Sequence, residues 1–131
     1  MGKGTIHDFS KYPIMNFIKS YIEQFGSKFN NLIAEGNLYN DSGNKTGIGY
    51  HGDAERSKVI GMRFGKTNES MPLYFRWFNN SKPISEPIQI KLNNGDIYIM
   101  SEKTTGYDWK KRSIYTLRHS VGADKYIKLP K

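Results

Sequence analysis

The stretch Ile48-Gly49-Tyr50-His51-Gly52-Asp53-Ala54-Glu55-Arg56 combines a His-x-Asp pair with a further acid and a base. In an extended segment, side chains two residues apart point to the same face, roughly 7 Å apart along the backbone. An imidazole and a carboxylate on one face can bind a single metal ion, and a facial triad of two histidines and one carboxylate needs one more histidine. His51 and Asp53 are therefore candidate metal ligands.

The composition indicates one folded domain over residues 1–131, with residues 1–11 as a flexible leader. Hydrophobic residues make up only 37% of the chain, but 14% are aromatic and can fill a core with few side chains. The chain has no cysteine, which excludes disulfides and thiolate zinc sites. The sequence has no long apolar run and no signal-type start, so we expect an intracellular protein that does not bind membranes. We expect it in the cytoplasm, with the nucleus as an alternative location, and as a monomer.

The net charge of +8 is concentrated near the C-terminus, where residues 101–131 carry 8 basic and 3 acidic side chains. A basic surface suits a polyanion, so nucleic acid is a candidate partner of this C-terminal third. Lysines account for 15 of the 20 basic residues, and a merely solubilising surface explains that composition equally well. Lys110, Lys111 and Arg112 flank Trp109, which either stacks on a base or anchors the loop to the core.

Apolar spacing predicts an amphipathic helix over 14–25, with Pro13 in its first turn and Gly26 at its end. The rest of the chain has β signals. We expect strands at Phe29–Tyr39, Gly47–His51, Lys58–Phe64, Pro72–Phe78, Ile88–Leu92, Ile97–Met100, Ser113–His119 and Tyr126–Leu129. Turn clusters at 40–44 and 93–96 separate some of them. The expected fold is mainly β, a double-stranded β-helix (jelly roll), with the helix packed on the sheet.

The third ligand has to come from elsewhere in the chain, which contains three histidines. His7 lies in the leader, whereas His119 follows His51 by 68 residues, near the end of a predicted strand. A double-stranded β-helix can bring such a late strand beside the early one, although a polar residue at a strand end needs no function. Lys128 follows across a predicted hairpin, where its positive charge can reach an acidic co-substrate.

From about Phe29 to Lys128 the chain resembles the AlkB-type branch of the Fe(II)/2-oxoglutarate dioxygenases. The matching segments are Phe29-Asn30-Asn31-Leu32-Ile33, Asn37-Leu38-Tyr39, Ile48–Glu55, and Gly95-Asp96-Ile97-Tyr98-Ile99-Met100-Ser101 followed by Asp108-Trp109. The third is similar to the family's I-x-x-H-x-D-x-E/D element and the last to its G-D/S-L-x-x-M segment. Four such segments in the family's order make the resemblance fairly specific.

The resemblance implies His51 and Asp53 as iron ligands, and Asn37 and Tyr39 near the 2-oxoglutarate. It places Glu55 where the family has an acidic residue facing the substrate. We also expect its neighbours in this stretch to contact substrate; they are Tyr50 and Arg56.

The C-terminal part departs from the family pattern, because lysines follow Trp109 and the R-x-N-x-x-x-R ending is missing. His119 is then the histidine left to complete the triad. Lys128 would take the co-substrate role that the family gives to arginine, as in prolyl-hydroxylase-like relatives, with Lys125 and Arg118 as competitors.

The expected function is therefore an oxygenase, an oxidoreductase using Fe(II), 2-oxoglutarate and O₂, whose chemistry lies at the metal centre. Its expected substrate is an alkylated or methylated nucleobase in DNA or RNA, which it hydroxylates or demethylates. Alternatives are a prolyl- or lysyl-type protein hydroxylase, a basic β-barrel that binds nucleic acid without chemistry, and a cupin-like metal protein that uses no 2-oxoglutarate.

Overall fold

The computed structural model describes residues 7–39, 45–65 and 71–128, in two compact units: Met1–Asn37 and Leu38–Lys131. The first unit contains the 3₁₀ turn η1 (Phe9–Lys11), the helix α1 (Pro13–Glu23) and a second 3₁₀ turn, η2 (Ser27–Phe29). The described part of the second unit contains seven strands and two short helices.

The helix α1 confirms the prediction from apolar spacing. Pro13 occupies its first turn, and Gly26 follows its end with a φ of +133°, a conformation that favours glycine. Along one face, Tyr21 lies between two other aromatic rings: its centroid is 6.5 Å from that of Phe17 and 5.4 Å from that of Phe25. The expected packing of this helix on the sheet stays a prediction.

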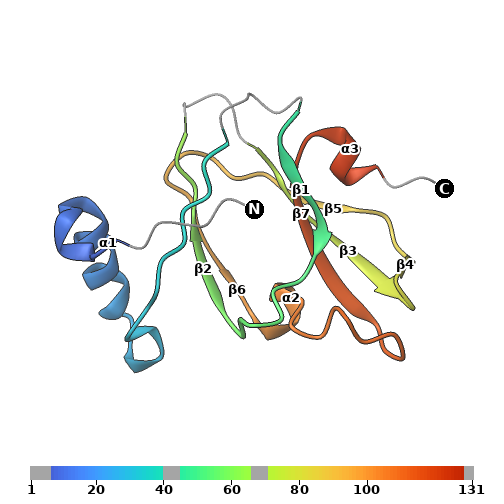
Figure 1. The fold of residues 1–131 in the computed structure, drawn as a ribbon, viewed down its shortest axis with the longest axis horizontal. Coiled ribbons are helices and arrows are strands. Elements are labelled where there is room, and N and C mark those ends of the chain that lie inside the picture. Colours follow the sequence, from blue (N-terminus) through green and yellow to red (C-terminus); the bar gives the residue numbers. More distant parts are fainter. Residues whose placement is uncertain (1–6, 40–44, 66–70, 129–131) are drawn as a thin grey trace. The chain divides into compact units, whose positions relative to one another are not determined.

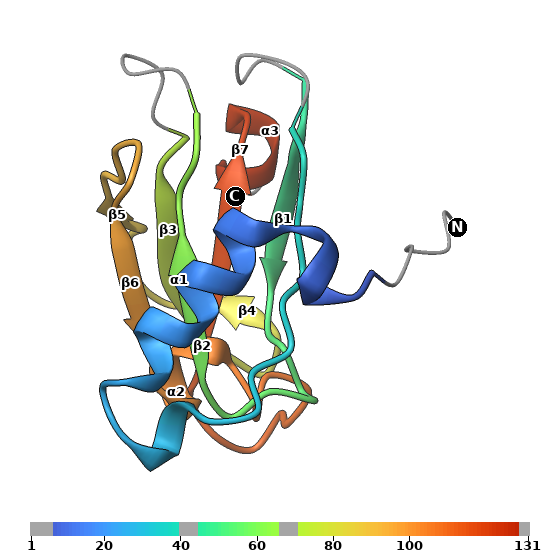
Figure 2. The same cartoon turned by 90° about the vertical axis from the view of Figure 1, so that its left-hand side faces the viewer.

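The second unit is β-rich, and its strands are β1 (Gly47–His51), β2 (Val59–Met62), β3 (Leu73–Asn79), β4 (Lys82–Pro83), β5 (Ile88–Ile90), β6 (Ile97–Met100) and β7 (Thr116–Gly122). The order β1-β7-β3-β4, with β5 also paired to β3, forms a five-stranded antiparallel sheet. This sheet curls into a half-barrel, and β2 and β6 form a separate antiparallel pair (Figure 1). β1 and β7, which are far apart in sequence, lie side by side at the centre of the site described below (Figure 2).

The core lies where the inner faces of the two sheets meet. Residues of the large sheet pack there against residues of the β2–β6 pair and one loop leucine; the buried cluster is Leu73, Phe75, Leu92, Met100 and Leu117, with Val59, Trp77 and Tyr98 partly buried against it. Burying each large apolar side chain contributes about 1.5–3 kcal/mol. His119 is two residues from Leu117 in β7, so it shares this inner face.

Two strand predictions are wrong. Residues 30–39 form no strand, and Ile33 and Leu38 there are 96% and 84% exposed, so this segment lacks the buried face that a strand needs. Tyr126 lies not in a strand but in the helix α3 (Asp124–Ile127), because β7 continues through Gly122 where a turn was expected. The helix α2 (Glu102–Thr105) and β4 were not predicted, and the turn expected at 40–44 lies outside the described residues.

No helix within residues 7–39, 45–65 and 71–128 has both the length and the apolar character required to cross a membrane.

Candidate metal centre

The structure brings His51, Asp53 and His119 together. The Nε2 atom of His51 lies 3.8 Å from Oδ1 of Asp53, and Nε2 of His119 lies 3.8 Å from Oδ2 of the same carboxylate. The two imidazole ring centres are 4.3 Å apart. One potential ligand atom from each of the three residues lies within 4.8 Å of the other two. This is the one group of three or more such side chains found among the described residues.

A β-bulge in β1 makes this convergence possible. Ile48 pairs with Val121 and His51 pairs with His119, so three steps along β1 match two steps along β7. Residues at odd separation in a regular strand point to opposite faces, but the extra residue of a bulge changes that parity. His51 therefore shares the inner face with His119. Without the bulge, Tyr50 would lie opposite His119 and His51 would point away.

A backbone carbonyl fixes the orientation of His51. Its Nδ1 lies 2.8 Å from the carbonyl oxygen of Gly49, which can only accept, so Nδ1 carries the hydrogen. The lone pair is then on Nε2, the atom that faces Asp53. A hydrogen bond of this kind selects the tautomer and raises the basicity of a metal-binding imidazole. Gly49 is part of the bulge, so one local distortion both places and orients this ring.

His119 is held in its neutral, metal-binding form. The pKa of His119 is lowered from 6.5 to about 4, mainly by burial and also by the adjacent His51, while Asp53 and the backbone of Thr104 oppose the shift. The residue is 8% exposed, and its ring centre lies 6.3 Å from that of Phe75. A metal ion competes with protons for imidazole nitrogen, so a low pKa keeps this ligand available at neutral pH.

Asp53 lies in the loop after β1 and is anchored to α2. Its backbone N–H donates to the carbonyl of Thr105 over 2.8 Å, and the Thr105 hydroxyl donates to the carbonyl of Arg56 over 3.1 Å. The Arg56 guanidinium approaches the Asp53 carboxylate, with 3.6 Å between Nη1 and Oδ2. The position of Asp53 is thus fixed by a hydrogen bond from its backbone and by an ion pair of its side chain.

The three side chains fit a divalent metal ion. Bonds of about 2.1 Å to nitrogen and oxygen bring neighbouring ligand atoms to about 3.0–3.4 Å of one another. The two histidine–carboxylate separations of 3.8 Å need a contraction of less than about 1 Å. The ligand atoms of the two histidines lie within 4.8 Å and need a contraction of at most about 2 Å, and side-chain rotation can supply both. Two neutral imidazoles and one carboxylate form the donor set typical of non-heme Fe(II) sites.

An apolar pocket of about 120 Å³ adjoins the centre. Phe75, the neighbour of His119, is part of its wall together with Leu73, Ile90, Tyr98, Ile99, Met100 and Thr104. None of the three candidate ligands lines the pocket, so Phe75 connects it with the centre.

The predicted co-substrate residues are dispersed. Burial raises the pKa of Tyr39, while the positive charge of Arg63 lowers it and Tyr98 raises it, so Tyr39 lies near the end of the β2–β6 pair. Asn37 is exposed and is the last residue of the first unit. Lys128 follows α3, where it forms an ion pair with Asp124 and remains 77% exposed.

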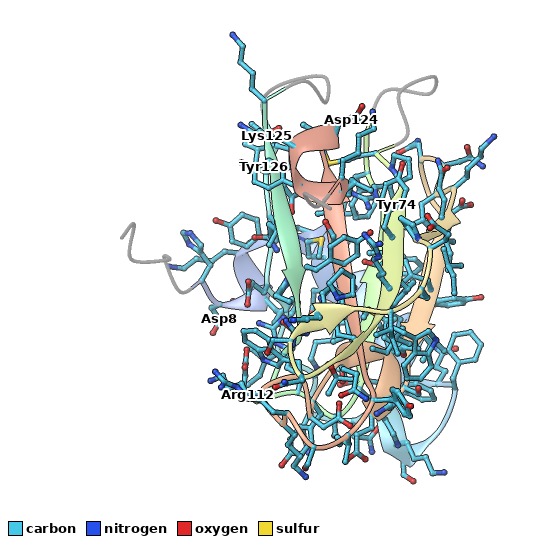
Figure 3. The ribbon with its side chains drawn as sticks, turned by 90° about the vertical axis from the view of Figure 1, so that its right-hand side faces the viewer. Asp8, Tyr74, Arg112, Asp124, Lys125 and Tyr126 are labelled. Atoms are coloured by element: carbon cyan, nitrogen blue, oxygen red, sulfur yellow. The ribbon has the colours of Figure 1, made fainter. Side chains whose placement is uncertain are left out.

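The two competitors of Lys128 also lie away from the triad. Lys125 is in α3, with its Nζ 4.9 Å from the ring centre of Tyr126. Arg118 precedes His119 in β7 and therefore points to the opposite face of the sheet. Lys125 lies at one end of the unit and Arg112 at the other, so the basic C-terminal third is divided between two ends (Figure 3).

Of the predicted substrate residues, Arg56 lies at the centre. Glu55 is 69% exposed beside it, with 3.7 Å between its Oε1 and Nε of Arg56. Tyr50 is not brought to the centre: it packs on Phe78 at the outer face, 5.6 Å between ring centres, and burial raises its pKa.

Backbone groups contribute to the centre in ways that side-chain patterns did not predict. These are the carbonyl groups of Gly49 and Thr105. The glycines on both sides of His51 were the available signal, since glycine often marks a bulge or a close backbone approach.

No known family model matches the chain, and neither does any solved structure. The chain is 48% identical over 126 residues to an uncharacterized protein of Acanthamoeba polyphaga mimivirus. The alignment covers 96% of this chain and 48% of the viral protein. The chain thus spans about half the length of the curated relative it matches.

Proposed function

We propose that the protein is an Fe(II)- and 2-oxoglutarate-dependent oxygenase. The observation that supports this most strongly is the convergence of His51, Asp53 and His119 through the bulge in β1. Two imidazoles and one carboxylate would hold Fe(II) and would leave room on it for a 2-oxo acid and for O₂.

The proposed jelly roll accommodates this centre. In a double-stranded β-helix the chain passes back and forth between two facing sheets. Here β1 lies in the large sheet, β2 in the pair, β3 and β5 in the large sheet, β6 in the pair and β7 in the large sheet again. This alternation supports the proposal.

Each residue of the centre has a defined role. His51 and His119 would bind the metal as neutral imidazoles, and Asp53 would supply the negative charge. When bound, iron couples decarboxylation of the 2-oxo acid to hydroxylation of a C–H bond in the substrate. The apolar wall of Leu73, Phe75 and Met100 would exclude water beside it.

Arg63 replaces Lys128 as the proposed partner of the distal carboxylate. It lies two residues after Gly61, and Gly61 pairs with Tyr98, which lines the apolar pocket. The charges of Arg63 and Tyr98 both act on Tyr39, so a guanidinium and two phenols lie near one another at this end of the β2–β6 pair. Arginine binds carboxylates in a bidentate manner, whereas the exposed Lys128 is already paired.

The proposed substrate is an alkylated nucleobase in single-stranded nucleic acid. The segment after Trp109 carries Lys110, Lys111 and Arg112, all exposed, and Tyr107 and Tyr115 nearby are 47% and 61% exposed. Trp109 packs on Gly52 between two of the metal ligands, so this basic segment adjoins the centre. Exposed basic side chains can bind the phosphates of a single strand, and exposed aromatic rings can stack on its nucleobases.

Consumption of 2-oxoglutarate tests the proposal. The protein should form succinate from 2-oxoglutarate only with Fe(II) and O₂, and His51→Ala or Asp53→Ala should abolish it. Lys82→Ala, an exposed change in β4, is a matched control that should retain turnover. Metal binding without any 2-oxoglutarate turnover would instead indicate a cupin-like metal protein. Turnover that persists in both ligand variants would contradict the proposal.

A further inference from the structure

Arg118 is buried without an acidic partner. It is 8% exposed, and its Nη2 donates to the carbonyl of Trp109 over 3.2 Å and to the hydroxyl of Ser81 over 3.4 Å. It forms no ion pair with any described residue, and its Nε has no hydrogen-bond partner among them. A buried charge with so few partners is costly to keep. Its contacts indicate what it does for the fold.

The guanidinium is held between aromatic rings. Its Cζ lies 4.4 Å from the ring centre of Phe78 and 5.3 Å from that of Trp109. Stacking of this kind contributes about 0.5–2 kcal/mol. Together with the hydrogen bond to the Trp109 carbonyl, it fixes both the backbone and the ring of Trp109.

Trp109 in turn limits the loop that carries Asp53. A Cβ atom on Gly52 would lie 2.7 Å from both Cβ and Cδ1 of Trp109, and 2.2 Å from the carbonyl oxygen of Gly106. These separations are too short for any side chain, so the loop backbone is seated directly on Trp109. Gly52 is the residue between His51 and Asp53.

We propose that Arg118 and Trp109 are positioning residues for the metal centre, acting from the outer face of the sheet. Trp109 supports the loop between the first two ligands. Arg118 holds Trp109 and directly precedes His119, the third ligand, so the pair links all three. The inference rests on the proposed metal centre but not on the identity of the substrate.

Arg118→Met tests this role, because methionine keeps the apolar stem and removes the hydrogen bond to Trp109. We expect it to weaken binding of Co(II) about 10–100-fold, the usual effect of losing a group that orients a metal ligand. The visible absorption of the bound Co(II) should change as well. The urea midpoint of the metal-free protein should stay the same or rise, since replacing a buried charge by an apolar side chain is often neutral or stabilising.

Arg76→Met is the matched control. Arg76 pairs with Arg118 across β3 and β7, but its Nε donates to the carbonyl of Ser85 over 2.6 Å. The variant Arg76→Met should leave the affinity for Co(II) and the absorption of the bound Co(II) unchanged. If Arg118→Met does not fold, Trp109→Phe provides a milder version of the same test and should also weaken Co(II) binding.

Three results would overturn the inference. If Arg118→Met binds Co(II) within twofold of the wild-type affinity and with an unchanged spectrum, the inference is overturned but the proposed function is not. A lower urea midpoint with unaltered Co(II) binding would show that the pair supports only the fold. Absence of Co(II) binding by the wild-type protein would overturn the inference and the proposed function together.

Discussion

The low pKa of His119 predicts an acid-sensitive metal-free protein. Burial is the main cause of the shift from the ordinary value of 6.5 to about 4, and the titratable groups that act on the imidazole are His51, Asp53 and Arg56. Between these two pKa values the unfolded chain binds a proton that the folded chain excludes. Stability is therefore fully present above pH 6.5 and is lost as the pH falls toward 4.

The size of this effect follows from the two pKa values. A shift from 6.5 to about 4 corresponds to at most about 3 kcal/mol. Between pH 7.5 and pH 5 the same linkage gives a loss of about 2 kcal/mol. A loss of that size is a large part of the 5–15 kcal/mol that typically stabilises a domain.

Urea unfolding with a chelator present, followed by tryptophan fluorescence, measures this loss. His119→Gln removes the titrating group, so its stability should fall between pH 7.5 and pH 5 by about 2 kcal/mol less than that of the wild type. Carboxylates that titrate in the same range contribute equally to both proteins. Equal losses in the two proteins would refute the assignment of a buried, neutral His119.

Three further predictions concern the centre directly. His51→Ala removes one ligand and should abolish Mn(II) binding in calorimetry, while Gly49→Ala, which keeps the backbone carbonyl that accepts from His51 Nδ1, should retain it. Mn(II) at one hundred times its Kd should stabilise the wild type by about 2.7 kcal/mol in thermal unfolding and should not stabilise Asp53→Ala. Arg63→Met should raise the KM for 2-oxoglutarate at least tenfold and Lys128→Ala should not, as succinate assays can show; the reverse order would restore Lys128 to the role.

Sequence patterns correctly predicted the helices and strands that depend mainly on residues close together in the chain. The helix α1 has five apolar residues at helical spacing, and β1 and β6 have the predicted bounds because short apolar runs end at polar turns. The segment at 126–129 failed because alternation over four residues also fits one helical turn. Asp124 at the start of α3, where an acidic side chain favours a helix N-terminus, was the competing signal.

The ligand set was predicted more completely than its surroundings. The His-x-Asp pair named His51 and Asp53, and the family resemblance added His119 as the remaining histidine; the structure brings the three together. The bulge was not predictable, because parity along β1 depends on its register with β7. The placement of Arg118 and Lys128 also depends on long-range packing. Their charge alone therefore did not predict the contact of Arg118 with Trp109 on the outer face or the exposed ion pair of Lys128 with Asp124.

The register between β1 and β7 has a consequence for how the chain folds. In the unfolded chain His51 and Asp53 remain neighbours, but His119 is 68 residues away and becomes a third ligand only after the two strands pair. Closing so long a loop is an entropic cost that slows folding. A metal ion first bound by His51 and Asp53 would gain His119 as its third ligand only when β1 pairs with β7. The additional binding energy would therefore favour the pairing of these two strands.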